Sequence, residues 1–203
     1  MIGGWRWVSG MSDSTHRDSV KQRSFRSSKE LVEYCKPIQQ GWYLCQAIAI
    51  GAAKLDPSEC EVACRAAVKA AQSESDLYRQ VAPLAWPIEA LALCGLHKQA
   101  QRLADETIRQ AMQITPGNSK ANCLDVLYWH VGLLDIGYRK KIFSILVNMA
   151  GVETGWRIKR NCACIAIDLD RLGERSFIDQ AISSCKDKKL IERVHRDRDR
   201  GCM

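Results

Sequence analysis

A short turn around a glycine recurs in the 203-residue sequence, and it constrains the fold more than any other feature. The three glycines, Gly95, Gly137 and Gly173, are 42 and 36 residues apart. In each copy a leucine lies four residues before the glycine and an apolar residue lies five residues after it. Glycine commonly ends a helix in the left-handed conformation, because it has no side chain to clash with the backbone. The spacing therefore predicts helical hairpins that repeat about every 40 residues.

Apolar residues at helical spacing surround these turns and predict four hairpins along the chain. The hairpins occupy about residues 38–71, 76–114, 119–150 and 155–185. The spacing of Ser27 and Glu30 is that of a capping box and predicts that a short helix starts there, ahead of the first hairpin. A charged helix is expected after the last hairpin, at about 187–196. No useful length of sequence alternates between apolar and polar residues as a strand does. We therefore expect an all-α fold, a right-handed α-α superhelix or short solenoid of about four hairpins plus terminal helices.

Two local patterns refine these hairpins. Asp56 followed by Pro57 predicts a helix start, because aspartate caps a helix and proline fits its first position. Pro83 and Pro87 lie within the first helix of the second hairpin, where they predict a kink or an early break.

The remaining parts of the chain are expected to lie outside the repeats. Residues 1–28 have no apolar period and are predicted to be a flexible lead-in, in which Met11 could be the natural start. Residues 29–196 are predicted to form a single solenoid domain, followed by a charged tail at 197–203. No apolar run is long enough to span a membrane, and no signal peptide is evident. These observations predict a cytoplasmic protein that does not associate with a membrane.

The second hairpin resembles the tetratricopeptide class of helical repeats. Gly95, Ala100 and Ala104 stand where that family has its turn glycine and two small packing residues. The sequence departs from the family at three positions of the preceding helix, where an aromatic, a small residue and tyrosine are preferred: Leu84, Ile88 and Leu91. The resemblance covers about 35 residues specifically and about 150 loosely. It implies a helical array with a peptide-binding role, while HEAT-like repeats of about 40 residues are the alternative.

In such arrays the first helix of each hairpin often lines the concave face. Six residues of the third and fourth hairpins lie off the predicted core stripes and are the candidate partner-binding residues: Asn122, Asp125, Trp129, Arg157, Asn161 and Asp168. Aromatic side chains beside arginine and asparagine are typical of protein recognition surfaces. The alternative is that Trp129, like Trp86 in the second hairpin, packs between helices as part of the core.

No motif identifies a catalytic or metal site. The ten cysteines mostly fall on apolar stripes, as reduced thiols packed in a core do, and the four histidines have no ligand spacing. We expect no cofactor and no metal, and an enzyme with an unrecognised site is a weaker alternative. The net charge of +7 is uneven, because residues 30–136 hold 12 acidic and 9 basic residues whereas residues 137–203 hold 9 acidic and 15 basic. A protein or peptide partner is favoured, and a nucleic acid bound by the basic C-terminal part is the second hypothesis.

Overall fold

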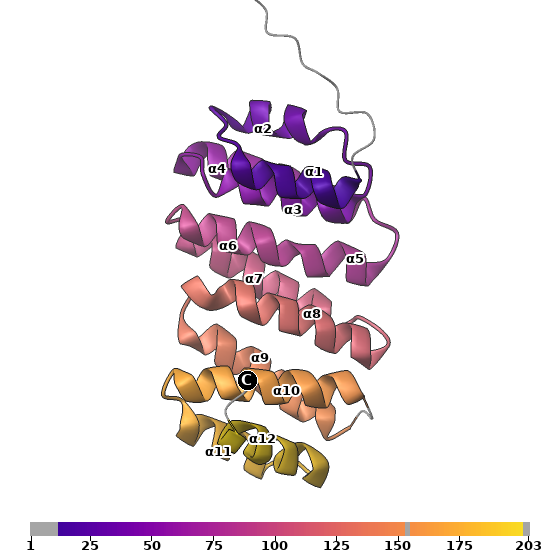
Figure 1. The fold of residues 1–203 in the computed structure, drawn as a ribbon, viewed down its shortest axis with the longest axis vertical. Helices are drawn as coiled ribbons and strands as arrows, with labels where there is room; N and C mark the ends of the chain where they lie inside the picture. The colour runs from indigo at the N-terminus through magenta and orange to yellow at the C-terminus, as the bar shows by residue number, and fades with distance from the viewer. Residues whose placement is uncertain (1–11, 153–154, 201–203) are drawn as a thin grey trace, which may run out of the picture.

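The computed structural model describes residues 12–152 and 155–200, and every regular element within these ranges is a helix (Figure 1). The expectation of an all-α fold is therefore confirmed for this part of the chain. The helices form two rows. The first row contains α1 (Asp13–Ser19), α3 (Gly41–Ala52), α5 (Leu77–Val81), α6 (Ala85–Leu93), α8 (Gly117–His130), α10 (Trp156–Arg171) and α12 (Lys188–Arg200). The second row contains α2 (Ser28–Cys35), α4 (Pro57–Gln72), α7 (His97–Ala111), α9 (Ile136–Ala150) and α11 (Arg175–Ser183).

In the middle of the first row, α3, α6, α8 and α10 pack on one another in chain order, each about 40 residues after the one before it. The Cys45 thiol on α3 donates to the Pro83 carbonyl at 3.4 Å, and the Asn161 amide on α10 donates to the Ala121 carbonyl on α8 at 3.1 Å. The residues in these pairs are 38 and 40 positions apart in the sequence. The stacking therefore has the same period as the hairpins predicted from the sequence.

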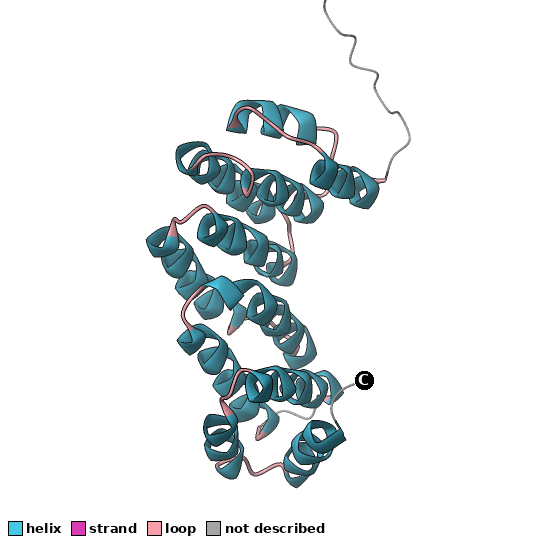
Figure 2. Cartoon of the chain, turned by 60° about the vertical axis from the view of Figure 1, so that its left-hand side comes forward, coloured by secondary structure: helices cyan, strands magenta, loops and turns pink. Residues whose placement is uncertain are grey.

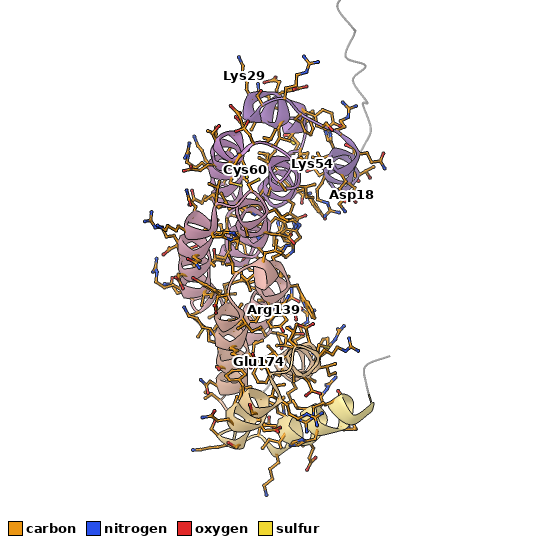
Figure 3. The ribbon with its side chains drawn as sticks, turned by 90° about the vertical axis from the view of Figure 1, so that its left-hand side faces the viewer. Asp18, Lys29, Lys54, Cys60, Arg139 and Glu174 are labelled. Carbon is orange, nitrogen blue, oxygen red and sulfur yellow. The ribbon has the colours of Figure 1, made fainter. Side chains whose placement is uncertain are left out.

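The row of first helices lies on the inner side of a curve. Figures 2 and 3 show that α1 and α12, at the two ends of the array, project on this side beyond the middle of the row. The second row lies on the outer side. The surface of the first row that faces away from the second row is called the first-helix face below.

Two of the three glycine turns are as predicted, and the third is not. Gly95 and Gly173 have φ angles of +76° and +85° and end α6 and α10. After each glycine the next N–H bonds back to a carbonyl five residues earlier, from Leu96 to Leu91 at 2.8 Å and from Glu174 to Leu169 at 2.9 Å. The prediction for Gly137 is wrong, because it lies within the first turn of α9 and has no positive φ. The third turn is instead made by a short 3-10 helix, η3 (Val131–Leu133), and by Asp135, which caps α9.

The predicted helix starts are confirmed. Ser27 accepts the Glu30 N–H, and Asp56 accepts the N–H groups of Ser58 and Glu59 at 3.0 and 3.1 Å. The Glu59 carboxylate in the first turn of α4 accepts the Ser28 N–H at 2.6 Å and so joins α4 to α2. The break predicted from the prolines is also present, as a 3-10 helix, η2 (Ala82–Leu84), between α5 and α6.

Ordered structure begins earlier than expected. Residues 13–22, which fall within the predicted flexible lead-in, form α1 and a 3-10 turn, η1 (Val20–Gln22). Polar contacts hold α1, since Arg17 donates to Gln46 at 2.8 Å and Asp13 accepts the N–H groups before α3. A composition rich in serine and charged residues conceals α1, which buries no residue of its own, while the following η1 contributes the buried Val20 to the core. The first eleven residues of the lead-in lie outside the described residues, and α12 extends into the predicted tail as far as Arg200.

Small and branched side chains fill the space between the two rows. Tyr128 and Phe143 are the largest of the fully buried side chains, and alanines of α3 and α4 let these two helices approach closely. Within residues 12–152 and 155–200, no helix is long and apolar enough to cross a membrane.

Candidate functional site

The six candidate residues lie on two neighbouring helices of the first row. Asn122, Asp125 and Trp129 are on α8, and the other three, Arg157, Asn161 and Asp168, are on α10. They do not form one uniform surface, because some of them use their polar groups to join helices.

The two asparagines are structural contacts. Asn161 is 7% exposed, and its amide donates to the backbone of α8 as described above. The Asn122 amide donates to the hydroxyl of Tyr78 on α5. A buried polar group needs a hydrogen-bond partner, and the neighbouring helix supplies it here. The expectation that Asn161 lies off the core is therefore wrong, since at the contact of two first helices the core is wider than one helical stripe.

Asp168 is also committed to the fold. Its carboxylate accepts the Tyr128 hydroxyl at 2.6 Å and the Arg139 guanidinium at 3.0 Å. The guanidinium also lies over the Tyr128 ring, 5.1 Å from its centre. Burial, followed by the contact with Asp168, raises the pKa of the Tyr128 hydroxyl. Asp168 thus holds α8, α9 and α10 together and is not available to a ligand as a free carboxylate.

Trp129 lies on the surface rather than in the core. Its side chain is 46% exposed, and its ring meets that of Tyr128 edge-on, with 5.0 Å between the ring centres. The indole N–H also interacts with the Asp125 carboxylate one helical turn earlier and lowers the pKa of that carboxyl. These two contacts fix the direction of a large exposed aromatic ring. A fixed ring loses little conformational freedom when it binds, which is the property of an anchor in a protein interface.

Asp125 has an unusual environment for a carboxylate near the surface. Burial raises its pKa, whereas the hydrogen bond from Trp129 and the charge of Arg160 on α10 act in the opposite direction. Its role in this geometry is to position the Trp129 ring.

A second aromatic cluster lies beside Trp129 on the first-helix face. The Trp86 ring on α6 packs against the His130 ring on α8, with 4.4 Å between their centres. The Glu89 carboxylate lies 2.7 Å from Nδ1 of His130. All three side chains are half-buried. The sequence analysis named Trp86 but missed His130, although the separation of 41 residues between His130 and Glu89 matches the repeat period.

The third cluster lies at the start of α10. Arg157 is exposed, and its guanidinium lies over the Trp156 ring, 5.4 Å from the ring centre. Trp156 is 59% exposed, and Arg160 is exposed on the same side of the helix. Sequence reasoning missed Trp156 and Arg160. The i, i+4 spacing of these two residues places both of them off the apolar stripe of α10, and this pattern could have identified them from the sequence.

Neither the cysteines nor the cavities indicate a catalytic or metal-binding site on this face. Burial raises the pKa of the Cys35 and Cys123 thiols to about 12, and Cys60 and Cys64 lie in the core with 3.9 Å between their sulfur atoms. Among the described residues, no group of three or more histidine, cysteine or acidic side chains could hold a metal ion. Two shallow cavities, of about 230 and 290 Å³, are lined in part by Tyr138 on α9 and by residues of α4, α5 and α7. They lie away from the exposed tryptophans.

Comparison with known proteins provides no relative: no protein family, curated protein or solved structure matches this chain. The arrangement of its own side chains is therefore the basis for a functional proposal. Oriented, exposed aromatic rings beside arginine and carboxylate groups can bind another molecule by stacking, apolar contact and hydrogen bonds.

Proposed function

We propose that this chain is a protein-binding module that holds a segment of a partner protein against its first-helix face. The single observation that carries the proposal is Trp129, which is 46% exposed and yet oriented by Asp125 and Tyr128. Large aromatic residues held in one conformation at a surface supply much of the binding energy of protein interfaces. The half-buried Trp86 on the neighbouring α6 extends the same surface.

We further propose that the array is a short right-handed solenoid of the tetratricopeptide class. The repeat period of about 40 residues in the interhelical contacts and the glycine turns at Gly95 and Gly173 support this assignment. In such an array the first helices line a continuous inner surface, which suits an extended or helical partner segment.

A second candidate is a nucleic acid, which the exposed arginines on α10 would favour. Two carboxylates oppose it, because Glu89 on α6 and Asp125 on α8 lie on the same face. A phosphate backbone that continued from α10 across the first row would meet both of them.

Substitution of Trp129 tests the proposal. Partner capture from an extract of the source cells should fall at least about tenfold in Trp129→Ala, because truncation of an interface anchor typically costs about 2 kcal/mol or more. The matched control is Val62→Ala on α4, since Val62 is 45% exposed but lies in the second row. Circular dichroism of both variants shows whether the fold is retained. Equal loss of capture in the two folded variants, or no loss in either, would contradict the proposal.

A further inference from the structure

We infer that the partner segment is acidic, and that Arg157 and Arg160 on α10 receive its carboxylates while Trp129 receives an apolar side chain. This inference rests on the proposed function and adds the chemistry of the partner. It concerns the C-terminal half of the first-helix face, which α8 and α10 form.

The first argument is that neither arginine forms an ion pair in the described part of the fold, although the charge of Arg160 acts on the half-buried Asp125. Both are exposed and are three positions apart, so they share one side of α10. Within residues 12–152 and 155–200, neither guanidinium forms an ion pair. Lys159 on the same helix is by contrast paired with Asp187 at 2.5 Å. Arg157 is also ordered by its stacking on Trp156.

The second argument is the balance of charge around these arginines. The carboxylate on α8, that of Asp125, is half-buried and interacts with the Trp129 indole as well as with Arg160. Asp168, farther along α10, is already compensated by Arg139 at 3.0 Å. This part of the face therefore presents an excess of positive charge beside exposed aromatic rings. Charge complementarity of this kind selects an acidic partner and speeds its association.

The third argument concerns the class of macromolecule. A peptide can place carboxylates over α10 and a neutral or basic residue over Glu89 on α6, because each of its side chains differs. A nucleic acid carries a phosphate at every step and cannot avoid Glu89 and Asp125. The mixed charge of the first-helix face consequently fits an acidic peptide segment better than a phosphate chain.

Synthetic peptides of about twelve residues provide the test, because this length spans about 40 Å when extended, or four helices about 10 Å apart. One labelled peptide carries leucine and tryptophan with glutamates between them, and a second has lysine in place of every glutamate. Fluorescence anisotropy should show at least about tenfold tighter binding of the glutamate peptide. The double substitution Arg157→Glu with Arg160→Glu should weaken binding of the glutamate peptide at least about tenfold and strengthen binding of the lysine peptide. The control, Lys98→Glu with Arg102→Glu, reverses two exposed cations on α7 in the second row and should change neither affinity more than about twofold.

The outcomes separate this inference from the proposed function. If both peptides bind equally and only Trp129→Ala weakens them, the face binds protein but the inference of an acidic partner is wrong. If the glutamate peptide does not bind at about 1 mM, the inference is also wrong. A single-stranded oligonucleotide that binds more tightly than the glutamate peptide, and that loses affinity in the double arginine variant, would overturn both proposals in favour of a nucleic acid.

Discussion

The three glycines of the repeated turn provide a sharp test of the fold, because the structure assigns them different roles. At Gly95 and Gly173 a new Cβ atom would meet nothing within 4 Å, so alanine would introduce backbone strain without a clash. A left-handed conformation costs a non-glycine residue about 1–2 kcal/mol, and the loss of freedom in the unfolded chain recovers about 0.4–1 kcal/mol. Gly95→Ala and Gly173→Ala should each lower the free energy of unfolding by about 1 kcal/mol.

Gly137→Ala should behave differently, because Gly137 has an ordinary helical conformation in the first turn of α9. Alanine gains up to about 1 kcal/mol of helix propensity. Its Cβ would lie 2.8 Å from Oδ1 of Asp135, the atom that caps the Gly137 N–H, so moving this side chain offsets much of that gain. We expect an unfolding free energy within about 0.5 kcal/mol of the unsubstituted protein.

Urea unfolding followed by circular dichroism at the helical minimum would measure all three variants. The two destabilised variants should also melt about 2–4 °C lower, as expected for a domain of this size. The reasoning would be refuted if Gly137→Ala lost as much stability as Gly95→Ala, because the third turn would then be left-handed as well.

Three further predictions concern stability and reactivity. Asp168→Ala should lower the free energy of unfolding by about 2–3 kcal/mol, because it leaves the Tyr128 hydroxyl and the Arg139 guanidinium without their shared acceptor, whereas Tyr128→Phe should cost about 1 kcal/mol. Lys159 holds the pKa of Asp187 below its usual value, so this pair stabilises the fold above the unfolded-state pKa and loses its effect as the pH falls. The stability difference between the unsubstituted protein and Asp187→Asn, measured in urea, should therefore shrink between about pH 7 and pH 3. The buried cysteines should react slowly with a thiol reagent at about pH 8 and fully after denaturation, and rapid labelling of the native protein would show that these thiols are accessible.

The sequence predicts the hairpins well because their signals are local. These signals are the glycines at positions 95 and 173, the caps at Ser27 and Asp56, and Pro83 before α6, and each of them acts within a few residues. The failures also have a physical cause. Gly137 occurs in a similar pattern, but Asp135 caps the next helix before the glycine is reached. Helix α1 is held in place by a polar contact with α3, so its sequence has almost no apolar period by which it could be recognised.

The candidate site was only partly predictable, since its side chains depend on neighbours about 40 residues away. Spacing alone placed Asn161 and Asp168 on the face, yet their partners, Ala121 and Tyr128, lie on another helix. Trp129 was identified as an aromatic residue that could be core or surface, and only the packing of α8 shows that it is exposed.

Site-specific photocrosslinking tests the central claim most directly. Benzoylphenylalanine would replace Trp129 in one protein and Val62 in another, so that probes of equal exposure lie in the first and second rows. The proposed function predicts covalent adducts with a partner protein from position 129 and few or none from position 62. Adducts that form equally at the two positions, or only at position 62, would contradict the claim that the first-helix face is the binding surface.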